Sequence, residues 1–227
     1  MDSLIYILFI CIVSPLLLML PLLKKWSRLI TGYMIIGIVL ALFVSEINTL
    51  LLRTLECDLA YFTTTITPAT EEIVKTVPIL FYALTFSDKR ERLMSIALAT
   101  GIGFGLFENT VVLVQSLVQS TDSVTIGWAL IRGFSTALMH GVCTMTVGFG
   151  ISFVKMKKKL FYCGTFALLT MALVYHGIYN MLVQSNFRWF GFVLPAITYI
   201  PIILQQYNFL KIKNTKTYLN LSKEKQL

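Results

Sequence analysis

Three charged residues lie inside one apolar stretch of the chain. Glu71, Glu72 and Lys75 interrupt residues 60–86, which are otherwise long and apolar enough to cross a membrane. A charged side chain at the bilayer centre costs about 2.5 to 3.5 kcal/mol, so three in one span indicate a function or dedicated partners. On a helix both carboxylates lie within one turn of the ammonium. We interpret this triplet as the centre of a candidate site; the alternative is a buried ion pair that only fixes helix packing.

Later apolar segments add further groups that could do chemistry. Glu108 follows a glycine-rich run, His140 lies eight residues after Arg132, and His176 and Asn180 share one helical face four residues apart. The two histidines are the only ones in the chain. A glutamate can act as general base on a water, while imidazole and amide donors stabilise an oxyanion. The set of residue types therefore suits hydrolysis.

A metal centre is the competing explanation for the same residues. Glu72, Glu108, His140 and His176 would make a plausible site for zinc or another divalent ion, with a water in an open position. The chain lacks the His-Glu-x-x-His spacing of zinc proteases. Metal-dependent hydrolysis and a metal-free glutamic type both stay open on the sequence alone.

The composition indicates a membrane protein. Of 227 residues 56% are hydrophobic and 13% charged, and the mean hydropathy is +0.77. The net charge of +8 does not predict nucleic-acid binding, because the basic residues lie in short loops between apolar segments. The four cysteines have no paired spacing, so we expect neither disulfides nor a cysteine zinc site.

The apolar segments predict an all-α, polytopic bundle of seven transmembrane helices in a single domain, residues 1–210. The catalytic core is expected at residues 60–183, and a basic cytoplasmic tail at 211–227. Each segment is long enough to span a bilayer. The predicted spans are 3–23, 29–52, 60–86, 93–118, 124–154, 160–183 and 187–208.

The distribution of basic residues predicts the orientation. Of the 19 Lys and Arg residues, 15 lie in the tail or after the first, third and fifth spans. The positive-inside rule then places the N-terminus outside and the C-terminus in the cytoplasm. With a rise of about 1.5 Å per residue, Glu71, Glu72, Glu108, His140 and His176 lie about 21 to 24 Å above the cytoplasmic ends of their helices. Four helices are thus predicted to bring ionisable groups to one layer nearer the outer face.

Three local patterns add expectations. Thr67 followed by Pro68 predicts a helix start that would place both glutamates near a helix N-terminus. Small residues four apart, Gly101 and Gly105, indicate close helix approach. Glu46 near the outer end of the second span is interpreted as an interface residue, with membership of the cluster as the alternative.

Taken together, these residues resemble the PrsW family of intramembrane proteases, which is related to the type II prenyl-protein (CAAX) proteases. The resemblance covers the third to sixth spans and depends on four motifs in order. They are Glu71-Glu72-x-x-Lys75, Phe104-x-x-x-Glu108-Asn109, Arg132 with His140, and His176-Gly177-Ile178-Tyr179-Asn180.

The resemblance implies an intramembrane endopeptidase that makes a site-1 cut, near the extracytoplasmic face, in a single-span membrane protein such as an anti-sigma factor. It implies that Glu71 or Glu72 is the general base. It also implies that Glu108 and His140 orient a water or metal and that His176 and Asn180 support the oxyanion. Lys75 and Arg132 would compensate the buried negative charge.

Two other functions fit an intramembrane polar cluster. Mid-membrane acids and histidines also occur in ion-coupled or proton-coupled transporters. A catalytically silent scaffold could use the same groups to bind transmembrane helices. The gathering of the polar groups at one depth favours the peptidase.

Overall fold

The computed structural model describes residues 2–119, 125–153, 158–202 and 204, and within these ranges the chain is helical with no strand. The prediction of an all-α protein is therefore confirmed for the described part. Residues 188–202 form a further helical stretch after the last labelled helix. The labelled elements are α1 (Asp2–Met19), η1 (Leu20–Leu22), α2 (Lys25–Thr54), α3 (Leu59–Tyr61), η2 (Phe62–Ile66), α4 (Thr67–Thr85), α5 (Arg90–Gln119), α6 (Ile126–Ile151) and α7 (Lys158–Val183).

Five of the described helices are long and apolar enough to cross a membrane. They correspond to the predicted first, second, fourth, fifth and sixth spans, and they support a multi-pass membrane protein. The third span contains the three charged residues of α4, and residues 188–202 form only part of the predicted seventh. The count of seven spans and the orientation of the termini stay predictions, and the tail at 211–227 lies outside the described residues.

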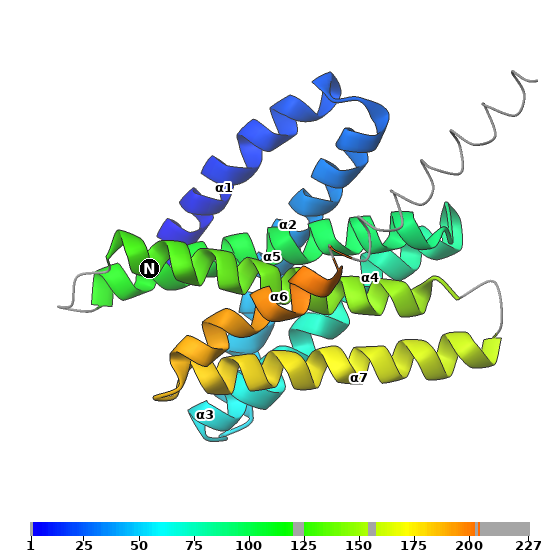
Figure 1. The fold of residues 1–227 in the computed structure, drawn as a ribbon. Coiled ribbons are helices and arrows are strands. Elements are labelled where there is room, and N and C mark those ends of the chain that lie inside the picture. Colours follow the sequence, from blue (N-terminus) through cyan, green and yellow to red (C-terminus); the bar gives the residue numbers. More distant parts are fainter. Residues whose placement is uncertain (1, 120–124, 154–157, 203, 205–227) are drawn as a thin grey trace, which may run out of the picture.

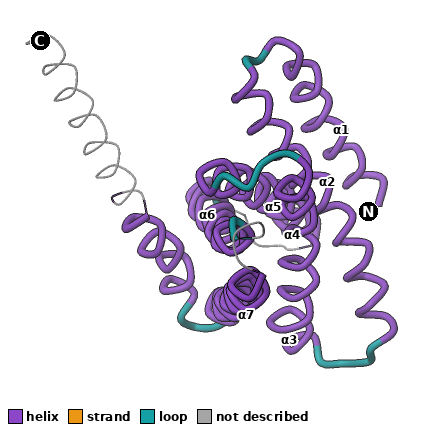
Figure 2. Tube along the Cα trace, turned by 90° about the vertical axis from the view of Figure 1, so that its right-hand side faces the viewer, coloured by secondary structure: helices purple, strands orange, loops and turns teal. Residues whose placement is uncertain are grey.

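Helices α5, α6 and α7 run side by side, while α1, α2 and the α3–α4 segment cross them at a steep angle (Figures 1 and 2). Helix α4 contacts α2, α5, α6 and α7. Helix α1 instead packs mainly along α2, and the two form a hairpin that leans away from the other helices (Figure 1). The charged residues of α4 are thus surrounded by four other helices.

The helix that carries the glutamates begins earlier than the sequence predicts. Asp58 is its N-cap and accepts a hydrogen bond from the Tyr61 amide at 3.1 Å. The helix then passes through η2, a π-helical turn, into α4 without a break. The predicted cap at Thr67 is therefore wrong, because the wider π-turn accommodates the missing amide of Pro68 within a continuous helix. Glu71 lies more than three turns from the helix start, beyond the reach of the dipole.

Glycines of α5 allow two helices to approach it from opposite sides. A Cβ at Gly101 would collide with the backbone of His140 on α6, and one at Gly103 with the backbone of Met34 on α2. A Cβ at Gly105 would meet the His140 ring itself. The prediction that Gly101 and Gly105 permit close approach is confirmed, and the contact fixes where His140 lies against α5.

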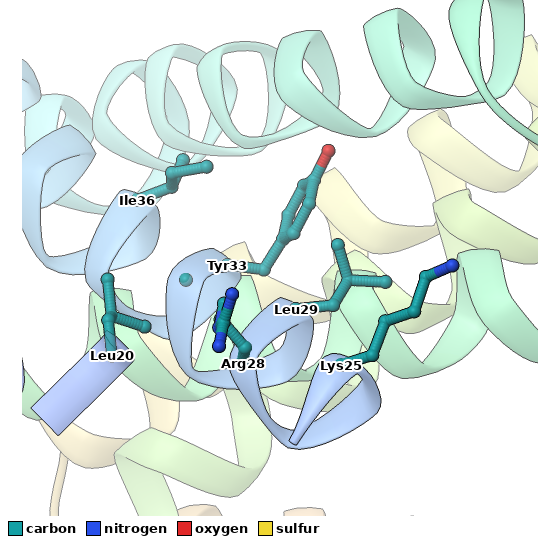
Figure 3. Close-up of a pocket in the computed structure, with 7 residues that line it drawn as sticks. Leu20, Lys25, Arg28, Leu29, Tyr33 and Ile36 are labelled. Atoms are coloured by element: carbon teal, nitrogen blue, oxygen red, sulfur yellow. The ribbon is translucent and has the colours of Figure 1, made fainter. Parts of the chain in front are cut away.

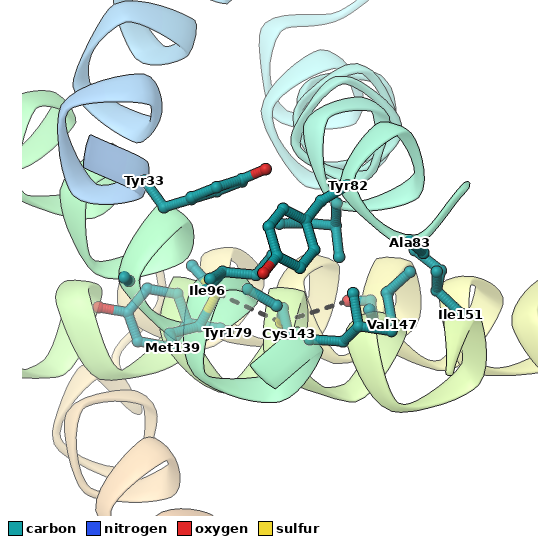
Figure 4. Packing of buried hydrophobic residues seen from close by; sticks show 14 residues of the cluster. Tyr33, Tyr82, Ala83, Ile96, Met139, Cys143, Val147, Ile151 and Tyr179 are labelled. Atoms are coloured by element: carbon teal, nitrogen blue, oxygen red, sulfur yellow. Dashed lines mark hydrogen bonds between the residues drawn. The ribbon is translucent and has the colours of Figure 1, made fainter. Parts of the chain in front are cut away.

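The main apolar core lies between α4, α5, α6 and α7, with Tyr33 of α2 at its edge (Figure 4). Tyr33 and Tyr82 of α4 meet edge to face with ring centroids 5.7 Å apart. Cys143 lies in this core, where its thiol contacts the Met139 sulfur and the Ala172 carbonyl (Figure 4). All four cysteines are free thiols, as the sequence predicts.

Candidate active site

Four helices bring the predicted acids and histidines into one buried cluster. Helix α4 supplies Glu71 and Glu72, α5 supplies Glu108, α6 supplies His140 and α7 supplies His176. Lys75 of α4 joins them and is fully inaccessible to solvent. Both histidines and both α4 glutamates are buried as well. The convergence that the depth estimate predicts is therefore present in the structure.

Lys75 links the two halves of the cluster. Its Nζ lies 2.6 Å from Glu72 Oε1 and 2.7 Å from His140 Nδ1. The ring of Phe104 lies beneath the same ammonium, with 4.5 Å from Nζ to the ring centroid. Because an ammonium only donates hydrogen bonds, His140 Nδ1 must accept one from it. Lys75 thus supplies positive charge to a cluster that contains three carboxyl groups.

Each histidine is held by a carboxyl group of another helix. His140 Nε2 lies 2.5 Å from Glu108 Oε2, and His176 Nδ1 lies 2.9 Å from Glu72 Oε1. These contacts assign the ring protons: Nε2 of His140 donates to Glu108, and Nδ1 of His176 donates to Glu72. The remaining nitrogen of each ring then carries a lone pair. The rings themselves meet edge to face, with centroids 4.8 Å apart.

Both remaining nitrogens are turned toward Glu71. Glu71 Oε2 lies 3.7 Å from His176 Nε2 and 4.0 Å from His140 Nδ1. This oxygen is buried and has no hydrogen-bond partner, and the same holds for Glu72 Oε2. Buried polar atoms are rarely left without a partner, so these oxygens indicate a missing water, ion or substrate group.

The donor set fits a divalent metal ion. One carboxylate oxygen of Glu71 and one nitrogen each of His140 and His176 lie within 4.8 Å of one another. Metal-binding histidines commonly donate their second ring nitrogen to a carboxylate, as these two do to Glu108 and Glu72. With an ion at this place, Glu71 would be a ligand, and Glu72 and Glu108 would orient the histidines. Lys75 Nζ would have to release His140 Nδ1 before a metal could bind there.

Glu108 connects the cluster to its surroundings. Its side chain is 32% exposed, whereas those of Glu72, His140 and His176 are at most 1% exposed. Of the acids and histidines in the cluster, Glu108 is therefore the least buried.

Asn180 lies near the cluster but serves another contact. Its amide donates a 2.9 Å hydrogen bond to the carbonyl of Thr63 in the π-turn. One turn earlier on α7, a Cβ at Gly177 would collide with the carbonyl of Thr64. The π-turn therefore packs closely against α7 through these two residues. The predicted oxyanion role of Asn180 stays a prediction, and the structure shows that the side chain anchors the helix leading to Glu71.

Arg132 makes no ion pair among the described residues. It is partly buried, and its Nε atom has no hydrogen-bond partner. On the neighbouring α5, Asn109 is buried with an unpartnered Oδ1 and lies beside Gly133 of α6. Charge compensation by Arg132 thus stays a prediction, and two unsatisfied polar atoms occur on neighbouring parts of α5 and α6.

Helix α2 makes a hydrogen bond to α4 directly beside the glutamate pair. Asn48 Oδ1 accepts a 2.6 Å hydrogen bond from the hydroxyl of Thr70, next to Glu71. Glu46 instead accepts a hydrogen bond from the Tyr6 hydroxyl of α1 at 3.0 Å and does not join the cluster. From the sequence, no role was assigned to Thr70. Its position directly before the glutamate pair was the only indication that it lies near the site.

Two aromatic residues near the cluster were also given no role in advance. The Phe104 ring packs against His140 with centroids 5.0 Å apart, in addition to its contact with Lys75. The Tyr179 hydroxyl lies within hydrogen-bond distance of the hydroxyls of Ser135 and Thr136. Phe104 and Tyr179 both belong to the motifs noted in the sequence. The motifs indicated that these positions matter, but not which residues they contact.

Comparison with known protein families gives one match. A family model described as "PrsW family intramembrane metalloprotease" matches residues 25–205, which include every residue of the cluster. Searches of curated proteins and of solved structures found no significant match.

Proposed function

Because the chain belongs to the PrsW family of intramembrane metalloproteases, we propose that this buried cluster hydrolyses a peptide bond of a single-span membrane protein. One observation carries the proposal. Two histidines, each held by a carboxyl group of another helix, lie beside the unpartnered oxygen of Glu71. His176 Nε2 is 3.7 Å from this oxygen, and His140 Nδ1, which also accepts a hydrogen bond from Lys75, is 4.0 Å from it. Such an arrangement holds a reactive water or an ion at a fixed place.

Glu71 is the better candidate for the central carboxylate of the pair. Oε1 of Glu72 is already engaged by Lys75 and by His176. Glu71 has a buried oxygen that faces both histidines and is bonded to neither. In a metal-free reaction Glu71 would accept a proton from the attacking water, and His176 Nε2 lies close enough to share in orienting that water.

In a metal-dependent reaction, Glu71, His140 and His176 would hold the ion. A bound zinc or similar ion supplies a Lewis acid and an activated water. Glu108 and Glu72 keep the two imidazoles in the tautomers that present lone pairs to the ion. Lys75 balances the negative charge of Glu72, with which it forms a buried ion pair.

The finer assignments follow from the family resemblance and from the basic loops. We assign the chain to a bacterial-type plasma membrane, with seven spans, the N-terminus outside and the cleavage site toward the extracytoplasmic face. The substrate class is a membrane-anchored regulator such as an anti-sigma factor. The concentration of basic residues after the first, third and fifth predicted spans supports this orientation.

Cleavage of a model transmembrane substrate by the full chain in proteoliposomes tests the activity. Glu71→Gln and His176→Ala should each lower the rate about 100-fold or more. Glu46→Gln is the matched control, because Glu46 is an acid of a neighbouring helix bound outside the cluster, to Tyr6. Wild-type rates in the first two variants, with unchanged unfolding temperatures, would refute the proposal.

Metal analysis of the purified protein separates the two catalytic types. If the reaction is metal-dependent, elemental analysis should find about one divalent ion per chain in the wild type and in Glu46→Gln, and a loss of that ion in Glu71→Ala. Full cleavage by a protein stripped of metal with a membrane-permeant chelator would instead favour the glutamic type.

Labelling of intact cells tests the orientation. In the proposed topology, Cys57 between α2 and α3 lies outside, while Ser87 between α4 and α5 lies inside. A variant with Cys57 as its only cysteine should react with a membrane-impermeant maleimide, and one with only Ser87→Cys should not. The reverse pattern would overturn the assignment of the N-terminus to the outside.

A further inference from the structure

A cavity of about 660 Å³ lies at the tip of the hairpin formed by α1 and α2 (Figure 3). Leu20 of η1 contributes to one wall. The other lining residues recur at helical spacing over the first turns of α2 and so share one face of that helix. They are Lys25, Arg28, Leu29, Gly32, Tyr33 and Ile36. None of them belongs to the histidine and glutamate cluster.

The cavity combines an aliphatic floor with two cations. Leu20, Leu29 and Ile36 supply the apolar surface, and Lys25 and Arg28 supply the charge. Among the described residues, no carboxylate lies within ion-pair distance of either cation. Positive charge that no carboxylate neutralises therefore lies directly beside an apolar groove.

The guanidinium of Arg28 is held in place before any ligand arrives. One of its terminal nitrogens donates to the carbonyls of Pro21 and Leu23, both at 3.0 Å. A guanidinium has five N–H donors, so others remain for an anion. An ordered cation loses less freedom on binding, which favours a specific ligand over diffuse attraction.

We propose that this groove binds an anionic phospholipid, with its phosphate at Lys25 and Arg28 and the upper part of an acyl chain along Leu20, Leu29 and Ile36. A soluble phosphate would leave the aliphatic surface uncovered. A zwitterionic lipid would bring its own cation close to these two side chains. The inner leaflet, where the proposed topology places the hairpin tip, is rich in anionic lipid, and each basic residue near it adds to the attraction.

The groove also touches the helix that carries the glutamates. The Tyr33 hydroxyl lies 3.4 Å from the carbonyl of Pro78 on α4, and its ring packs on Tyr82 (Figure 4). Pro78 follows Lys75 by one helical turn. A lipid bound against Tyr33 would therefore contact a residue that packs on α4. Because the groove exists only in the folded protein, bound lipid should also raise the free energy of unfolding.

Lipid retention by the full chain tests the charge component. The purified protein is titrated with phosphatidylglycerol or phosphatidylcholine in detergent, and bound lipid is counted by native mass spectrometry. We expect phosphatidylglycerol to bind about ten-fold more tightly, and the double variant Lys25→Gln, Arg28→Gln to lose that preference. Lys24→Gln is the control, because Lys24 is exposed beside Lys25 but does not line the groove. Equal losses in the control and the double variant, or equal binding of both lipids by the wild type, would overturn the proposal.

A second variant tests the groove without changing any charge. Gly32 lines the groove, and a Cβ there meets nothing within 4 Å, so the side chain in Gly32→Leu would start in open space and extend into the groove. Gly164→Leu on α7 is the control, since that position is equally open. We expect the first to weaken phosphatidylglycerol binding at least ten-fold and to abolish the rise in unfolding temperature that this lipid causes. Unchanged binding in Gly32→Leu would contradict an acyl chain in the groove.

Discussion

Helices α6 and α1 are both apolar enough to cross a membrane, yet they occupy opposite environments. In α6, 72% of the most apolar stretch is buried inside the protein; in α1 only 6% is. The more hydrophobic of the two is α1, which contains no polar group of the cluster, whereas α6 contributes His140. Hydropathy therefore does not indicate which membrane helix forms the core.

The difference in burial between α6 and α1 follows from the forces that associate helices in a bilayer. Lipid is as apolar as leucine, so burial of an apolar side chain against another helix gains little there. Small residues that permit backbone contact, and polar groups that need partners, drive helices together instead. Helix α6 has both kinds, and α1 has neither in quantity. Substitutions in the core should therefore lower the free energy of unfolding more than substitutions in the hairpin of α1 and α2.

Removal of the central cation should have the largest effect on stability. Lys75→Met leaves the buried Glu72 without its closest counter-charge and should cost about 3 to 5 kcal/mol of unfolding free energy. Lys24→Met, at an exposed position in the hairpin turn, should stay within about 0.5 kcal/mol. Chemical unfolding in micelles measures both. Similar values for the two lysines would remove the distinction between core and hairpin.

The next effect is steric. Gly101→Ala places a methyl group against the backbone of His140 and should cost about 1 to 3 kcal/mol, because neither backbone can yield. Gly164→Ala has open space around it and should be neutral, or more stable by up to about 1 kcal/mol. The same unfolding assay compares the two alanines. A stable Gly101→Ala protein would show that α5 and α6 are less closely packed than described.

Two hydrogen bonds between Thr63 and the end of α7 allow a finer comparison: Asn180 donates to the Thr63 carbonyl, and Gln184, just after α7, accepts from the Thr63 hydroxyl. Asn180→Ala leaves the π-turn carbonyl without its donor and should cost about 1 to 2 kcal/mol. Gln184→Ala removes only an exposed contact with the Thr63 hydroxyl and should cost less than about 0.5 kcal/mol. Hydrogen exchange of the amides around the π-turn should increase in the first variant only. If the two variants behave alike, Asn180 does not anchor the turn.

The smallest predicted effect concerns the contact between α1 and the core. Phe9 meets Phe107 of α5 edge to face at 5.6 Å, and Phe9→Ala should cost about 0.5 to 1.5 kcal/mol. Ile10→Ala, on the outward face of the same helix, should leave the unfolding free energy unchanged. A larger loss in Phe9→Ala than in Gly101→Ala would show that the hairpin contributes more to the fold than its burial indicates.

The sequence was sufficient to predict that these segments are helical and that their acids and histidines come together. Apolar length determines where a membrane helix can lie, and a constant rise per residue then gives each side chain a height. His140 and His176 were assigned to one layer by that argument, and the structure brings them into contact. The family motifs were found in the same way, because they depend on spacing along the chain.

The partners within the layer could not be predicted. Each residue rotates the helix by about 100°, so an uncertain helix start leaves the facing side chains undetermined. This is why the sequence did not distinguish Glu71 from Glu72, and why it did not reveal that the amide of Asn180 reaches Thr63. The π-turn that replaced the predicted cap at Thr67 depends on packing against Gly177, a contact 110 residues or more distant in the chain.

The burial of three charges in α4 has a consequence for how the protein is made. A segment with Glu71, Glu72 and Lys75 near its middle would be rejected, or held back, by an insertion machinery that tests one helix at a time, at about 2.5 to 3.5 kcal/mol per charge. Its compensating groups on α5, α6 and α7 are synthesised only afterwards. Helix α4 must therefore wait in the translocation site or at the lipid boundary until its neighbours emerge, which makes integration of these four helices a joint event during translation.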